Sequence, residues 1–140
     1  MFGTDYEAGP NHVLLAWHSD DLCGPWTAHA ANPIKIDVRS SRPAGTPFVF
    51  EGALYRPAQD CSRHYGGAVV LNRITRLTPF VFEEEGVCVL RPNGREPYRD
   101  GLHTLSQAGS KTLIDGCRRT FIWPAFSTAV RARLGLDRRS

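Results

Sequence analysis

The chain has 140 residues, which suits one domain of ordinary size. With 41% hydrophobic and 22% charged residues, its composition is that of a packed globular domain and excludes a disordered or membrane-spanning chain. The net charge is +3, but four arginines lie in the last ten residues. The basic excess is therefore concentrated in the tail, and we expect no nucleic-acid partner.

The sequence carries few targeting or cofactor signals. No apolar run approaches the ~20 residues that cross a bilayer, and the N-terminus lacks the order of a signal peptide, so the cytoplasm is favoured. No Gly-rich phosphate loop or G-x-S-x-G motif occurs. Because the cysteines are widely spaced without a C-x-x-C pair, we expect buried free thiols, no zinc site and no cofactor. These cysteines are Cys23, Cys61, Cys88 and Cys117.

Short apolar stretches separated by Gly, Pro, Asn and Asp indicate successive strands and an all-β fold. His12 to His18 predicts a first strand, and Gly24 to His29 predicts a second extended segment. The next four strands are predicted at residues 42–50, 52–56, 65–74 and 80–90. Glu51-Gly52 joins the first two of these as a hairpin, and the four together predict one four-stranded antiparallel sheet.

After a loop at residues 91–100 the pattern starts again, with strands at 102–107, 111–114 and 119–123 and a turn at 108–110. Arg42 and His103 begin corresponding strands about sixty residues apart, close to the period of one four-stranded blade of a β-propeller. We therefore predict about two blades of a propeller in residues 1–125, followed by a basic tail in residues 126–140. Since a propeller needs about four to eight blades to close, we expect further N-terminal blades as partners of this chain.

The segment Ser19 to Trp26 (SDDLCGPW), followed by Asn32-Pro33-Ile34, resembles a loop of one group of glycoside hydrolases. In the arabinanases, xylosidases and invertases of that group, the loop joins the outer strands of a blade. Its role there is architectural, because the Gly-Pro pair makes a turn and the Trp covers the edge of the blade.

A second resemblance joins several motifs in one order between residues 12 and 118. The motifs are His29, Asn32-Pro33-Ile34, Asp37, Arg39, Arg42 to Gly45, Leu54 to Ser62, Tyr65-Gly66 and Gly101 to Thr104. Together they resemble the N-terminal propeller domain of plant glucosamine inositolphosphorylceramide transferases and their bacterial relatives. The resemblance implies a five-bladed, glycosidase-like propeller and sugar handling, with the glycosyltransferase chemistry in a separate domain.

The first strand of a propeller blade lines the central channel, so polar residues at the starts of such strands face a shared pocket. Arg42 and His103 hold these equivalent places. Arg can donate a planar fork of hydrogen bonds to a carboxylate, a phosphate or vicinal hydroxyls, and His can donate or accept near neutral pH. We expect both to face a ligand, or else to make buried structural hydrogen bonds.

The densest polar cluster in an apolar setting is Arg56-Pro57-Ala58-Gln59-Asp60. In one interpretation Arg56 and Asp60 line the pocket and Gln59 binds sugar hydroxyls. In the other, Arg56 and Asp60 form a buried ion pair that fixes the turn between two strands. The predicted substrate-binding set is thus Arg42, Arg56, Gln59, Asp60 and His103.

Hydrolysis of a glycosidic bond by the usual route needs two carboxyl groups on either side of the bond. Asp37, Glu51, Asp60 and Asp115 are available, but none stands in a pattern typical of an acid and base pair, so no catalytic residue is assigned. The run Glu83 to Glu85 is expected on a solvated strand or outer edge.

These patterns favour a carbohydrate-handling module whose partner is a glycan or another sugar-containing ligand. Two alternatives stay open. The chain could belong to an active hydrolase whose catalytic carboxylates lie in upstream blades, or it could be a structural or interaction module in which the polar channel residues satisfy one another.

Overall fold

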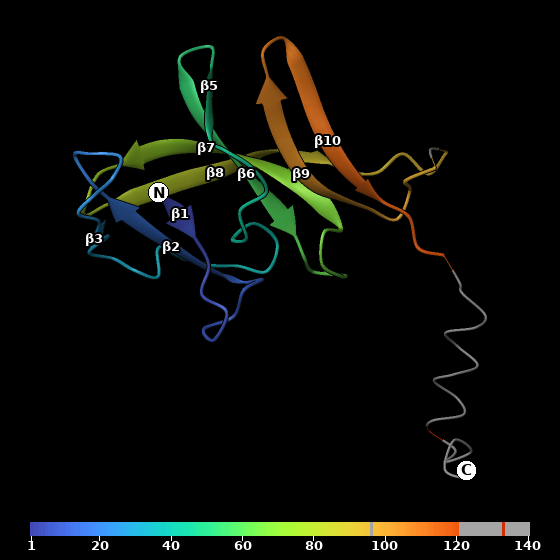
Figure 1. The fold of residues 1–140 in the computed structure, drawn as a ribbon, viewed down its shortest axis with the longest axis horizontal. Helices are drawn as coiled ribbons and strands as arrows, with labels where there is room; N and C mark the ends of the chain where they lie inside the picture. Colours follow the sequence, from blue (N-terminus) through green and yellow to red (C-terminus); the bar gives the residue numbers. More distant parts are fainter. Residues whose placement is uncertain (96, 121–132, 134–140) are drawn as a thin grey trace.

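The computed structural model describes residues 1–95, 97–120 and 133, and all the elements it defines there are β-strands (Figure 1). They form antiparallel sheets that follow one another along the chain. The all-β prediction is therefore confirmed. The blade arrangement of a propeller stays a prediction, and the predicted basic tail lies, apart from Arg133, outside the described residues.

The first sheet is built around β2 (Val13–His18), whose apolar sequence buries Leu14 completely. On one edge β2 pairs with β1 (Phe2–Gly3), and on the other edge it pairs with β3 (Thr27–Ala28) and β4 (Lys35–Ile36). Between the last two, the Asn32 side chain takes the place of a strand residue. Its Oδ1 accepts from the Ala16 N–H at 2.9 Å, and its Nδ2 donates to the Ala16 carbonyl at 2.8 Å.

The second sheet has the strand order β5 (Phe48–Phe50), β6 (Ala53–Asp60), β7 (Ala68–Leu77) and β8 (Phe82–Leu90). The predicted four-stranded sheet is confirmed. So is its hairpin, because Glu51 and Gly52 form the two-residue turn with φ values of 48° and 76°.

The strand predicted from residue 42 begins only at Phe48. Before it, the chain makes a single bridge from Pro43 to Ala58. Two prolines lack the N–H that a ladder needs, and Gly45 has a φ of 147° where the chain passes close to the Leu105 carbonyl.

The third sheet is the hairpin of β9 (Gly101–Ala108) and β10 (Lys111–Cys117), which turns at Gly109 with a φ of 61°. In Figure 1 this hairpin rises beside the shorter one formed by β5. The strand predicted at 119–123 is not seen at residues 119 and 120, and its remainder lies outside the described residues.

The second sheet contacts its neighbours through both faces. One face meets the third sheet, where Ala44, Val69 and Leu105 form a buried cluster and the Leu105 N–H donates to the Ala44 carbonyl at 2.7 Å. The other face meets the first sheet, where the rings of Phe2 and Phe82 lie 5.7 Å apart. The chain is thus a series of sheets packed in sequence order.

All four cysteines are free. Only Cys61 is buried, so the prediction of buried thiols is wrong for Cys23, Cys88 and Cys117. Cys23 lies in the loop before β3, and the other two lie on β8 and at the end of β10, strands whose residues are largely exposed.

Candidate functional site

The Tyr65 hydroxyl brings Arg42 and His103 together. Arg42 Nη2 lies 3.5 Å from this oxygen, and its guanidinium carbon lies 4.8 Å from the centre of the Tyr65 ring. Arg42 Nη1 donates to the Pro10 carbonyl at 2.8 Å, which fixes the guanidinium over the ring. The predicted meeting of these two residues therefore occurs through a third side chain that the sequence did not single out.

His103 continues this row of polar groups. Its Nε2 contacts the Tyr65 hydroxyl, its Nδ1 lies 3.2 Å from Asp115 Oδ2, and its ring meets the Tyr65 ring edge-on at 4.6 Å. Gly66 allows the approach: it has a φ of 68°, and a Cβ there would stand 3.0 Å from the imidazole. We call Arg42, Tyr65, His103 and Asp115 the Tyr65 cluster.

The Tyr65 cluster is open to solvent on one side. Tyr65 is 49% exposed, and the side chains of His103 and Asp115 are 30% and 61% exposed. The cluster therefore offers an aromatic surface together with groups that donate and accept hydrogen bonds, which is what a polyhydroxylated ligand requires.

Arg56 does not reach this cluster. It is 1% exposed, and its Nε and Nη2 donate to the two carboxylate oxygens of Glu84 at 2.8 and 2.6 Å. Nη2 and Nη1 also donate to the carbonyls of Ser40 and Ser41 at 2.6 and 3.2 Å. These bonds join the second sheet to the segment that leaves the first.

The predicted ion pair between Arg56 and Asp60 is wrong, because β6 runs unbroken between them and separates them by about 13 Å. The prediction for Glu83 to Glu85 is right for the outer two, whose side chains are 57% and 50% exposed, and wrong for Glu84, which is 3% exposed. The alternation of β8 turns Glu84 to the face that carries Arg56.

Gln59 is also buried, with 2% exposure. Its Oε1 lies 3.6 Å from the Cys61 thiol, and its backbone N–H donates to the Arg42 carbonyl at 2.8 Å. Gln59 thus fixes the position of Arg42 through the backbone. Asp60 accepts from the N–H and hydroxyl of Ser62 and stands at the rim of a hollow.

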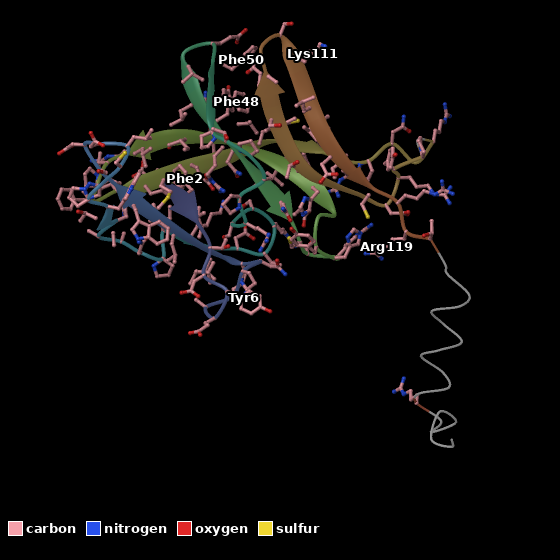
Figure 2. All side chains as sticks on the ribbon, in the orientation of Figure 1. Phe2, Tyr6, Phe48, Phe50, Lys111 and Arg119 are labelled. Atoms are coloured by element: carbon pink, nitrogen blue, oxygen red, sulfur yellow. The ribbon has the colours of Figure 1, made fainter. Side chains whose placement is uncertain are left out.

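Next to the Tyr65 cluster lie two adjoining hollows of about 320 and 660 Å³ that share Asp60, Ser62, Arg63 and Arg91. They lie where the end of the second sheet meets residues 35–40, and the 91–100 loop closes one side. In Figure 2 the labelled Arg119 lies near the foot of β10, and its N–H donates to Asp100 at 2.7 Å. We call both together the basic hollow, since five cationic side chains line it: Lys35, Arg39, Arg63, Arg91 and Arg99.

Sequence reasoning missed the basic hollow and Tyr65. Arg39 and Tyr65 occurred only as letters in a motif. Arg63 and Arg91 each lie just beyond a strand end, so the strand pattern could have placed them at one edge of the sheet.

Asp37 anchors the loop at the rim of the basic hollow. Burial raises the pKa of this carboxyl, but hydrogen bonds from the Ser40 hydroxyl and the Arg39 N–H, with the charges of Lys35 and Arg39, outweigh it and hold the pKa below its ordinary value. Asp37 is thus an ionised structural group. Glu51 lies at the tip of the β5–β6 hairpin, and no cluster of metal-binding side chains occurs among the described residues.

The family model for the N-terminal region of glucosamine inositolphosphorylceramide transferase 1 matches residues 1–97. The chain belongs to this family. Among curated proteins it is 45% identical over 89 residues to glucosamine inositolphosphorylceramide transferase 1 of Oryza sativa subsp. japonica, covering 60% of this chain and 12% of that protein. It is 31% identical over 128 residues to the protein of that name from Arabidopsis thaliana, covering 84% and 17%.

This chain of the glucosamine inositolphosphorylceramide transferase 1 N-terminal family thus spans a small part of those relatives. The family predicted from the ordered motifs is confirmed. The matched segment contains Arg42 and Tyr65 and ends before His103. No solved structure matches, and the described residues include no helix long and apolar enough for a membrane crossing.

Proposed function

We propose that this chain is a carbohydrate-handling module, a non-catalytic part of a glycosyltransferase-like protein, and that it binds its ligand at the Tyr65 cluster. The observation that carries the proposal is the convergence of Arg42 and His103 on the exposed hydroxyl of Tyr65. These three side chains come from three separate segments of the chain, and the fold brings them to one place.

The chemistry of the cluster suits a sugar. A pyranose presents an apolar C–H face, which packs against an aromatic ring, and hydroxyls that need both donors and acceptors. Tyr65 offers the ring, Arg42 offers donors only, and His103 can donate or accept. Since Pro10 and Asp115 already position Arg42 and His103, the ligand would meet groups that lose little freedom on binding.

Family membership supports the same assignment. The relatives are named as transferases that act with glucosamine and inositolphosphorylceramide, and this chain corresponds to 12–17% of their length. We propose that the transfer chemistry belongs to the remainder of such proteins. We also propose that the sheets are blades of a five-bladed, glycosidase-like propeller in which the Tyr65 cluster faces the channel.

The two alternatives have less support. A hydrolase needs a carboxylate free for acid or base work, but Asp37 is bound within its own loop and Glu51 lies at a hairpin tip. A structural module would use the same cluster only to hold the 61–67 loop against β9. It would therefore show a stability effect without a ligand effect when the cluster is changed.

The proposal is tested by screening the 140-residue chain on a glycan array and measuring the affinity of the best glycan by calorimetry. Tyr65→Phe removes the shared hydroxyl and should weaken binding roughly two- to tenfold, the value of one hydrogen bond, whereas Tyr65→Ala should abolish detectable binding. Tyr6→Phe is the matched control, because Tyr6 is 87% exposed and lies outside the cluster. A chain that binds no glycan, or a Tyr65→Phe variant that loses stability but keeps its affinity, would overturn the proposal.

A further inference from the structure

The basic hollow holds more positive charge than its own groups neutralise. Four guanidinium groups line it, and none has an ion-pair or side-chain hydrogen-bond partner among residues 1–95, 97–120 and 133: Arg39, Arg63, Arg91 and Arg99. All four residues are exposed. By contrast, the arginines on the body of the second sheet, Arg56, Arg73 and Arg76, are paired with glutamates.

The carboxylates of the hollow are engaged by nearby backbone and hydroxyl groups. Asp37 accepts from Arg39 N–H and the Ser40 hydroxyl, Asp60 accepts from Ser62, and Asp100 accepts from the Arg119 N–H. They number three against the five cations. The hollow therefore attracts an anion, and planar guanidinium groups suit carboxylate or phosphate.

A second and independent observation is the Asn72 side chain at the floor of the hollow. Asn72 is 1% exposed, and its Oδ1 has no hydrogen-bond donor among the described residues, while its Nδ2 donates to the Arg56 carbonyl at 3.3 Å. On the neighbouring strand the paired residue is Gly86, whose missing Cβ would stand 3.8 Å from Oδ1. A buried acceptor without a donor is unfavourable, and a ligand hydroxyl would satisfy it.

We propose that the basic hollow is a binding site for a carbohydrate that carries an anionic group, either a phosphate or a carboxylate. The guanidinium groups of the rim hold the anionic group, and Asn72 Oδ1 accepts a hydrogen bond from a ring hydroxyl. The inference rests on the proposed function, because it assumes a carbohydrate ligand. It goes beyond that function by adding a second site next to the Tyr65 cluster and naming the ligand's charge.

The size of the hollow favours a small ligand over a nucleic acid. The larger part, about 660 Å³, is comparable to the pockets that take small molecules. Nucleic acids instead follow a long basic stripe along a surface. Single-stranded DNA is therefore included in the test as a probe that should not compete.

The test is a titration of the ¹⁵N-labelled 140-residue chain, followed by NMR, with glucose 6-phosphate and glucuronate. Glucose and inorganic phosphate are titrated in parallel. We expect the Arg Nε–H signals of the rim and the Asn72 Nδ2 signals to shift with at least one of the two anionic sugars, and to shift at about tenfold higher concentrations of glucose or phosphate alone. The two anionic sugars separate a phosphate site from a carboxylate site.

Two variants report on the two halves of the site. Arg63→Gln with Arg91→Gln should weaken binding of the anionic sugar about tenfold or more, while Arg73→Gln with Arg76→Gln removes the same charge on another part of the sheet and should leave it unchanged. Gly86→Ala should weaken it roughly two- to tenfold by covering Asn72 Oδ1. Gly94→Ala is its control, since nothing lies within 4 Å of a Cβ there.

The inference is overturned if glucose or phosphate alone binds as well as the anionic sugars, if both arginine pairs have equal effects, or if DNA competes at equal phosphate concentration. It is also overturned if no anionic sugar shifts the Asn72 signals. A neutral glycan that binds and is lost in Tyr65→Ala, with no response of the basic hollow, would leave the proposed function standing while this inference fails. Binding of anionic sugars that is unaffected by Tyr65→Ala would have the opposite meaning.

Discussion

The buried ion pair between Arg56 and Glu84 is the contact whose loss should damage the fold most. Replacing Glu84 with Ala leaves the Arg56 guanidinium, 1% exposed, with two carbonyl partners and no counter-charge. Lys35, which lies 2.6 Å from the same carboxylate, would be a second uncompensated cation beside it. Breaking such a pair from one side costs about 3–5 kcal/mol, a large share of the roughly 5–15 kcal/mol that stabilises a domain.

Urea unfolding measures this cost. For a slope of about 2 kcal/mol/M, the Glu84→Ala variant should unfold at a midpoint about 2 M lower than the parent chain. Glu85→Ala is the matched control: it removes the adjacent glutamate, whose pair with Arg73 is about half exposed, and should cost less than about 1 kcal/mol. Equal midpoint shifts in the two variants would refute the reasoning. The double variant Arg56→Met with Glu84→Leu should recover most of the loss, since no unpaired charge remains.

Two further predictions concern the packing of β9 and the loop before Ser41. Gly45→Ala should destabilise the chain by at least about 2 kcal/mol, because the new Cβ would lie 1.9 Å from the Leu105 carbonyl oxygen; thermal unfolding beside Gly94→Ala checks this, and equal stabilities would contradict it. Asp37 has a folded pKa below its ordinary value of 3.8, so its ionised form stabilises the fold above that pH and the contribution is lost as the pH falls through the lowered pKa. Asp37→Asn should therefore be less stable than the parent chain near pH 7 and lose less stability on acidification below about pH 4, in urea titrations at each pH; identical pH profiles would contradict this.

Much of the second sheet could be predicted from sequence because its signals are local. Apolar alternation defines β7 and β8, and a Glu-Gly pair between two such runs defines the β5–β6 hairpin. The start of β5 could not be predicted in this way, because it depends on the approach of Gly45 to the Leu105 carbonyl, about sixty residues away in the chain. Contacts between sheets leave no periodic mark in the sequence.

The candidate site divides along the same line. The equivalence of Arg42 and His103 followed from the spacing of two strand starts, and the structure brings the two together. The hydroxyl that joins them belongs to Tyr65, in a loop whose course is set by the left-handed conformation of Gly66. Neither spacing nor composition gives the direction of a loop side chain, and for that reason Tyr65 could be recognised only as a letter in a motif.

The segment from Arg56 to Asp60 shows how strand period decides which residues can share a site. These residues lie in one strand, β6, so alternate side chains point to opposite faces. Gln59 therefore cannot face the same side as Arg56 and Asp60, and of those two only Asp60, at the end of the strand, reaches the rim of a hollow. Arg56 lies deeper and has to be neutralised within the fold, which is the role of Glu84 two strands away. A polar cluster inside a buried strand is thus divided between scaffold and site, and its strand ends indicate where a ligand can enter.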